Sequence, residues 1–145
     1  MGHSRGADVG NYLKETMPTD TMTEVRIPFL NDITRRYKIF AGPHSPNKGG
    51  GRHHYRIIAV DNDGKIDFET NINFQEGALN EHPHNGVLSI AILSLLKDHF
   101  ESFQEGEFKN RETAIVITKL EEAIHWVCAR ADERSSRNVL GKHQA

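Results

Sequence analysis

The sequence has few features of a secreted, membrane-spanning or nucleic-acid-binding protein. Its 145 residues include one cysteine, Cys128, so no internal disulfide can form and a reducing compartment is expected. The longest apolar run, residues 89–96, is too short to cross a bilayer, and the first ten residues lack the apolar stretch of a secretion signal. The net charge of -2 argues against a general nucleic-acid binder. We therefore expect a soluble, cytoplasmic protein.

Residues that carry out catalysis are also scarce. The sequence has 9 histidines, but no HExxH pattern, Cys–His pair or carboxylate cluster accompanies them, so neither a metal site nor a cofactor is expected. His53 and His54 are neighbours in a predicted strand and should point to opposite faces. Cys128 lacks an evident base and is interpreted as a small core residue. Without a credible acid–base pair, no catalytic residue is predicted.

Period-two patterns predict a small antiparallel sheet of about three strands, at residues 35–40, 52–60 and 65–75. In the last of these, Ile66, Phe68, Thr70, Ile72 and Phe74 should share one face. Residues 41–51 hold two prolines and four glycines, which fits either an exposed connection or a loop that closes over a ligand. A sheet this small needs a helix or a partner on one face.

Two helices are predicted after the sheet. Asn85 is a candidate N-cap for a helix over residues 87–104, whose apolar residues cover nearly its whole circumference. Gly106 ends this helix, and Asn110 caps the next one. The short link makes the pair an antiparallel hairpin. One small sheet and one neighbouring helix cannot cover a helix that is apolar all round, so we expect part of its surface to be a subunit interface.

The predicted fold class is therefore α+β: a small antiparallel sheet, then a C-terminal antiparallel helical hairpin that oligomerises. A polar tail over residues 1–24, with at most a short helix at 11–15, should precede a single domain over residues 25–145. In that domain the sheet part would cover residues 25–80, the hairpin 84–136 and a C-terminal tail 137–145.

Two clusters on the hairpin could bind a ligand. Trp126, Arg130 and Arg134 recur every four residues and share one helix face, where arginines suit phosphate and the indole suits a base or ribose. Alternatively, Trp126 packs in the hairpin and the arginines are solvated or pair with Glu122 and Asp132.

The second cluster lies at the hairpin turn and comprises Phe103, Asn110, Arg111 and Thr113. It could form half of a pocket, or serve only for capping and packing. About 30 Å of helix separates it from the arginines, so one subunit cannot bring both clusters to one ligand. Two antiparallel copies could do so.

Several long stretches carry a family resemblance. They are FQEGALNE with HNGV (residues 74–87), SFQEGEFKNRETAIVITKLEEAIHW (102–126), the Arg-rich helix end and RNVLGKH (137–143). These stretches resemble the phage Thoeris anti-defence proteins of the first type. Their hairpin is similar to that of the phage anti-CBASS cyclic-nucleotide sponge. The resemblance covers about residues 61–143, extends plausibly to 52–60, and is not visible in residues 1–34.

The resemblance implies a non-catalytic sponge in the cytoplasm of the infected bacterial host. Such proteins bind glycocyclic ADP-ribose isomers made by TIR proteins, and some also bind cyclic oligonucleotides at separate sites. They assemble from dimers into hexamers, with pockets between hairpins of different subunits. Neither a nucleic-acid polymer nor a membrane is an expected partner. By matching motifs, Phe103, Thr113, Arg130 and Arg134 would contact ligand, with Asn110 and Arg111 as neighbours.

The chain departs from the family pattern at two places. Thr113 stands where the family usually has Asn, which removes an amide donor. The closing motif lacks its usual Glu, because Leu140 occupies that position. Two alternatives to the sponge remain, an enzyme that hydrolyses a nucleotide signal and a phage protein whose hairpin only oligomerises.

Overall fold

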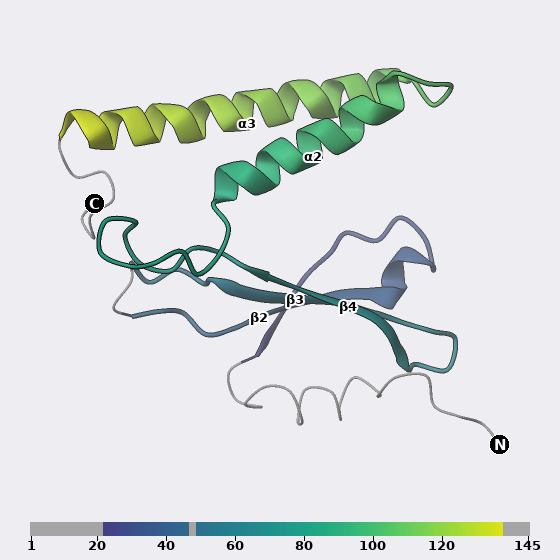
Figure 1. Cartoon of the computed structure of the whole chain (residues 1–145). Coiled ribbons are helices and arrows are strands. Elements are labelled where there is room, and N and C mark those ends of the chain that lie inside the picture. Colours follow the sequence, from purple (N-terminus) through teal and green to yellow (C-terminus); the bar gives the residue numbers. More distant parts are fainter. Residues whose placement is uncertain (1–21, 47–48, 138–145) are drawn as a thin grey trace. The chain divides into compact units, whose positions relative to one another are not determined.

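The computed structural model describes residues 22–46 and 49–137, which form a β-sheet followed in sequence by a helical hairpin (Figure 1). The chain divides into two compact units, residues 1–74 and 75–145. The predicted α+β class and the order of sheet and hairpin are confirmed. The predicted short helix at 11–15, two residues of the glycine-rich loop and the tail beyond Arg137 lie outside the described residues.

The sheet has four antiparallel strands in the order β1-β2-β3-β4, where about three were predicted. The added strand, β1, begins within the segment expected to be a polar tail and pairs with β2 through Val25 and Ile39. A short 3₁₀ helix, η1, leads into β2. The elements are β1 (Thr23–Val25), η1 (Thr34–Arg36), β2 (Tyr37–Ala41), β3 (His54–Val60) and β4 (Ile66–Asn73).

The core of the sheet unit is a buried cluster of Phe40, Ile58 and Ile66, with Met22 and Val60 packed against it. Ile58 is fully buried, and it lies on β3 between the flanking strands β2 and β4. A central strand supplies the best-shielded position because both neighbours cover it. The cluster is small, as expected for a sheet of this size.

An irregularity in β4 changes which residues share a face. Ala59 lies opposite Phe68, whereas the next residue of β3, Val60, lies opposite Ile66. The extra β4 residue between these pairs places Ile66 in the buried cluster and leaves Phe68 51% exposed. The prediction that Ile66 and Phe68 lie on one face was therefore wrong, since strict alternation fails at a bulge.

The segment between sheet and hairpin is closed by Asn85, which was predicted to cap the first helix. Its side chain instead accepts from the backbone N–H of Glu76 at 2.8 Å and donates to the carbonyl of Glu76 at 2.9 Å. Its own N–H donates to Gln75 Oε1 at 3.0 Å. The N-cap position is Leu88, and no side chain caps the helix there. Asn85 thus stabilises a loop by bonding to Glu76 and Gln75, which precede it by nine and ten positions.

The hairpin consists of α2 (Ser89–Gln104) and α3 (Arg111–Ser136), which run side by side in opposite directions (Figure 1). Neither helix has a buried residue among those described. Leu95, for example, is 62% exposed although it lies in the apolar part of α2. Within the described residues, the helices lack the combination of length and apolar content that a membrane span requires.

Candidate functional site

The turn of the hairpin is held by reciprocal bonds between Gln104 and Asn110. The Gln104 amide donates to the carbonyl of Asn110 and accepts from its N–H, each at 3.0 Å. Asn110 Oδ1 accepts from the N–H of Thr113 at 2.7 Å, which confirms the predicted cap of α3. Asn110 Nδ2 donates to the carbonyl of Phe108 at 2.8 Å. Both polar ends of the Asn110 side chain therefore stabilise the turn.

An aromatic group lies beside this turn. The Phe103 ring makes edge contacts with His99 and Phe108, with ring centroids 5.2 and 6.5 Å apart. Phe103 is still 43% exposed, so part of its ring is accessible in a single chain. Neither His99 nor Phe108 was predicted from the sequence as a neighbour of Phe103. The spacing of four residues from His99 to Phe103 was the available signal.

Arg111 and Thr113 complete the polar part of the turn cluster. Arg111 is the first residue of α3 and is exposed, and Thr113 is half-buried two residues later. Both lie in the first turn, where the helix presents its positive end. The structure therefore places Phe103, Asn110, Arg111 and Thr113 at one end of the hairpin, as the sequence predicted.

The other end of α3 carries Trp126 and the arginines. Trp126 is 71% exposed, and its ring makes an edge contact with His125 at 5.6 Å between centroids. The alternative in which Trp126 packs within its own hairpin is therefore wrong. Trp126, Arg130 and Arg134 lie four residues apart within one continuous helix, so they share a face.

Glu133 contacts two arginines at the C-terminal end of α3. Its Oε2 lies 3.4 Å from Arg130 Nη1 and accepts from Arg137 Nη2 at 3.1 Å. One alternative from the sequence paired the arginines with Glu122 and Asp132, whereas Glu122 lies 3.5 Å from Lys119. The spacings of three and four residues from Glu133 would have revealed its role. Arg134 is half-buried in the last turn.

The two clusters remain far apart in one chain. From the Asn110 cap to Arg130, α3 is a continuous helix that spans about 30 Å at 1.5 Å per residue. Its straight course is visible in Figure 1. One protomer does not bring Phe103 to the arginines.

Two other features of the hairpin concern reactive groups. Cys128 is exposed, so its interpretation as a core residue was wrong for a single chain.

Lys97 forms an ion pair with Glu101 on α2 and lies 3.9 Å from Glu121 on α3. The hydrogen bond to Glu101 raises the pKa of Lys97 above its ordinary value, so Lys97 remains a cation. Within residues 22–46 and 49–137, no group of three or more His, Cys, Asp or Glu side chains could hold a metal ion.

Comparison with known proteins places this hairpin in a family. The model of the Acb2/Tad1 hairpin domain matches residues 69–132. A protein named Thoeris anti-defense 1, from Bacillus phage SBSphiJ7, is 38% identical over 96 residues. These two matches support a Thoeris anti-defence protein. The aligned part spans 66% of this chain and 66% of the phage protein.

The Acb2/Tad1 hairpin match includes most of the candidate residues. The turn cluster, Trp126 and Arg130 fall inside it, whereas Arg134 lies two residues beyond its end. The name of the phage relative assigns a role in anti-defence against Thoeris to that protein.

Proposed function

We propose that the protein sequesters a cyclic ADP-ribose-type signalling nucleotide, such as a glycocyclic ADP-ribose isomer, and thereby blocks the Thoeris response without chemistry. The observation that carries the proposal is the exposure of both hairpin clusters. Phe103 is 43% and Trp126 71% exposed, and each lies on a helix next to at least one arginine or polar donor.

The proposed ligand-binding residues are those named from the sequence. Arg130 and Arg134 bind the pyrophosphate, since guanidinium groups match its oxygens in pairs. The adenine stacks on Phe103, and Arg111 and Thr113 donate hydrogen bonds beside it. Asn110 acts by fixing the turn, since both ends of its side chain are engaged there. Trp126 extends the face that contacts the ribose.

The proposed pocket lies between two copies, because about 30 Å of helix separates Phe103 from Arg130. In an antiparallel pair of hairpins, the arginine end of one copy meets the turn end of the other. The exposed apolar side chains of α2 supply the surface for such pairing. The proposed assembly ranges from a dimer to a hexamer, and cyclic oligonucleotides are candidates for a separate site on it.

The energies of these contacts suit a tight sponge. A hydrogen bond to a charged group contributes roughly 1.5–3 kcal/mol, and base stacking on an aromatic ring about 1–3 kcal/mol. Several such terms in a preformed pocket reach the roughly -12 kcal/mol of nanomolar affinity.

The experiment is calorimetry of the full chain with a panel of cyclic ADP-ribose isomers and cyclic di- and trinucleotides. Arg130→Ala should weaken binding of the preferred signal by at least about tenfold, because it removes a charge-assisted contact. Lys119→Ala is the matched control, since Lys119 is also a cation on α3 paired with a glutamate. Its affinity should equal that of the parent protein.

A second readout separates a sponge from the two alternatives. The ligand is released from the complex by heating and analysed by chromatography. Intact ligand supports sequestration, whereas a cleaved product would show a hydrolase. An Arg130→Ala protein that keeps full anti-Thoeris activity would instead favour a protein whose hairpin only oligomerises.

A further inference from the structure

A hollow of about 260 Å³ lies in the sheet unit, beside the end of β1. Pockets that bind small molecules measure about 300–1,000 Å³, so this hollow approaches the lower end of that range. Five residues between Glu24 and Phe29 form one wall, and Tyr37 and Lys38 of β2 form the other. The hollow therefore has room for a small organic ligand.

The hollow opens where the ladder between β1 and β2 stops. The last pair is Val25 opposite Ile39, although β2 extends two residues further. The same register would place Arg26 opposite Lys38, and like charges directly opposite each other destabilise a sheet. Pro28 follows and has no N–H to donate to a neighbouring strand. The sequence therefore ends β1 here and leaves space between the two segments.

The loop after this wall is held by its own hydrogen bonds. Asn31 Oδ1 accepts from the N–H of Thr34 at 3.0 Å, and the Thr34 hydroxyl donates to the carbonyl of Asn31 at 2.9 Å. The same hydroxyl oxygen accepts from the N–H of Leu30 at 3.0 Å. The Arg35 guanidinium carbon lies 5.4 Å from the centre of the Phe29 ring. Phe29 is thus positioned before any ligand binds, which lowers the entropic cost of binding.

Two aromatic rings line the hollow, Phe29 from the loop and Tyr37 from β2. Each residue is 44% exposed, so both rings have accessible surface. Val25 and Ile27 add apolar side chains to the lining. Aromatic side chains bind flat rings by offset stacking and by edge contacts. The apolar part of the hollow therefore suits a planar aromatic group.

The charges of the lining favour an anion. Arg26 and Lys38 are the two cations, and Glu24 is the one carboxylate, so the net charge is +1. Lys38 Nζ donates to Glu24 Oε1 at 3.4 Å, and this pair is neutral as a whole. Across residues 22–46 and 49–137, the Arg26 side chain has no hydrogen bond or ion pair. Its guanidinium supplies the positive potential that attracts an anionic group.

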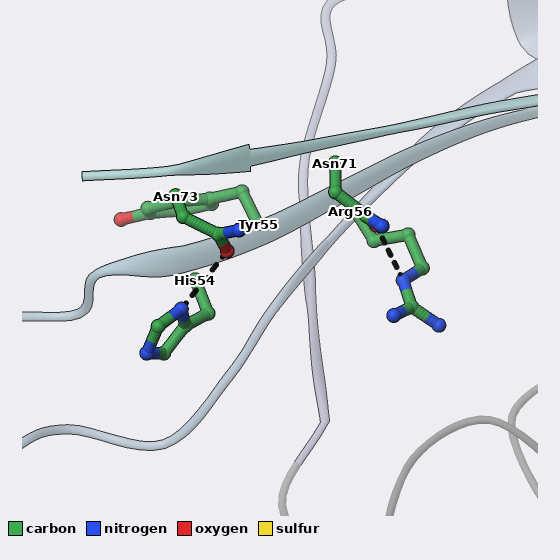
Figure 2. A pocket seen from close by; sticks show the side chains of 5 residues that line it. All are labelled: His54, Tyr55, Arg56, Asn71 and Asn73. Carbon is green, nitrogen blue, oxygen red and sulfur yellow. Dashed lines mark hydrogen bonds between the residues drawn. The ribbon is translucent and has the colours of Figure 1, made fainter. Parts of the chain in front are cut away.

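A second hollow on the sheet provides a contrast (Figure 2). It measures about 90 Å³. Its basic side chains are engaged within the sheet, because Arg56 Nε donates to Asn71 Oδ1 at 2.7 Å and His54 Nδ1 lies 2.9 Å from Asn73 Oδ1. The hollow beside Arg26 is larger and combines two aromatic rings with its cation. It is therefore the stronger candidate for a ligand site.

We propose that the hollow between residues 24–29 and β2 binds a planar aromatic anion, at a site made of sheet residues alone. The aromatic group of the ligand contacts Phe29 and Tyr37, and its anionic group binds Arg26, whose guanidinium matches phosphate and carboxylate oxygens in pairs. Two sources share this chemistry, a nucleoside monophosphate and an aromatic carboxylate. The site does not depend on the function proposed for the hairpin.

The test is a titration of the methyl-labelled full chain, followed by NMR. The probes are adenosine 5′-monophosphate and indole-3-acetate, compared with adenosine, which lacks the anionic group, and ribose 5-phosphate, which lacks the aromatic group. Saturable shifts of the Val25 and Ile27 methyl signals are expected with an aromatic anion. Binding of adenosine and of ribose 5-phosphate should be weaker by about tenfold or more. The aromatic anion that binds more tightly identifies the source.

Two variants and a control make the test specific. Arg26→Gln removes the cation, and Phe29→Leu removes a ring but retains an apolar side chain. Each should weaken binding of the preferred anion by about tenfold. Arg26→Gln should not change the weak binding of adenosine, since adenosine has no anionic group. Lys65→Gln is the control, because Lys65 is a cation of the sheet unit that does not line the hollow.

Three results would overturn the proposal. The first is that neither aromatic anion shifts the Val25 and Ile27 signals saturably. The second is that adenosine or ribose 5-phosphate binds as tightly as the aromatic anions. The third is that both Arg26→Gln and Phe29→Leu retain the parent affinity.

The two variants should fold, because both side chains belong to exposed residues. The methyl groups of Val25 and Ile27 line this hollow, so their signals report on it even where the hairpin also binds the nucleotide. Failure of this proposal and failure of the function proposed for the hairpin are therefore distinguishable.

Discussion

At the scale of single residues, Glu133 controls the arginine end of the candidate site. Its carboxylate lies near Arg130 Nη1 and accepts a hydrogen bond from Arg137 Nη2. An anionic ligand at Arg130 has to displace this carboxylate. Since exposed ion pairs contribute about 0–1 kcal/mol, the displacement has a small cost in binding free energy.

Replacing Glu133 by Gln should therefore strengthen binding of the nucleotide signal. We expect a gain in affinity of up to about fivefold, because removing the competing charge recovers at most about 1 kcal/mol. Calorimetry of Glu133→Gln against the parent protein measures this change. Glu122→Gln is the control, as Glu122 pairs with Lys119. Weaker binding by Glu133→Gln would mean that Glu133 orients the arginines productively.

At this scale, spacing along one helix is enough to predict which side chains share a face. The four-residue spacing of Trp126, Arg130 and Arg134 was sufficient to place them on one face. The same rule, applied to acids, would have found Glu133. The exposure of Trp126 could not be read from spacing, because it depends on where α2 packs against α3.

At the scale of elements, the loop before α2 depends on Gly77. Its φ of +88° lies in the region that favours glycine. A Cβ built there would lie 2.3 Å from His82 Cδ2. The adjoining residue, Glu76, forms two hydrogen bonds with the Asn85 side chain. The backbone at Gly77 therefore has to remain in this conformation for Asn85 to close the loop.

Gly77→Ala should destabilise the protein by about 1 kcal/mol or more, because alanine is strained at positive φ and meets the His82 ring. Urea unfolding followed by circular dichroism measures the change. Gly106→Ala is the matched control, since a Cβ at Gly106 would meet nothing within 4 Å. That variant should be as stable as the parent or slightly more so. Equal stability of the two variants would contradict the role given to Gly77.

The elements that sequence predicted well are those with local signals. The period of α2 and α3, the Asn110 cap and the alternation in β3 depend on neighbours within a few residues. The predictions that failed concern contacts between residues that are far apart in the sequence. β1 is three residues long and exists through pairing with β2, and Asn85 bonds to a residue nine positions away. The bulge opposite Val60 likewise arises between strands.

At the scale of the whole molecule, the hairpin leaves large apolar side chains exposed. Neither α2 nor α3 has a buried residue among those described. The exposed apolar residues of the hairpin include Leu88, Leu95, Leu96, Phe108, Ile115 and Val116. Where exposed apolar side chains form one patch, the patch is typical of an interaction site. It agrees with the proposed assembly of hairpins from several copies.

Leu95→Glu should therefore reduce the mass of the assembly. Leu95 is 62% exposed in the single chain, so a charge there is tolerated by the protomer and is costly in an apolar interface. Native mass spectrometry of parent and variant gives the stoichiometry. Glu122→Gln, on the polar surface of α3, is the control and should keep the parent mass. An unchanged mass for Leu95→Glu would place the interface elsewhere.

The length of α3 between the turn cluster and Arg130 has a kinetic consequence under the proposed function. A ligand bound by two different chains can dissociate only when its contacts with one of them are broken. Its residence time is then linked to how often chains exchange between assemblies. Mixing loaded protein with an excess of empty, tagged copies would show whether ligand transfer and subunit exchange share one rate.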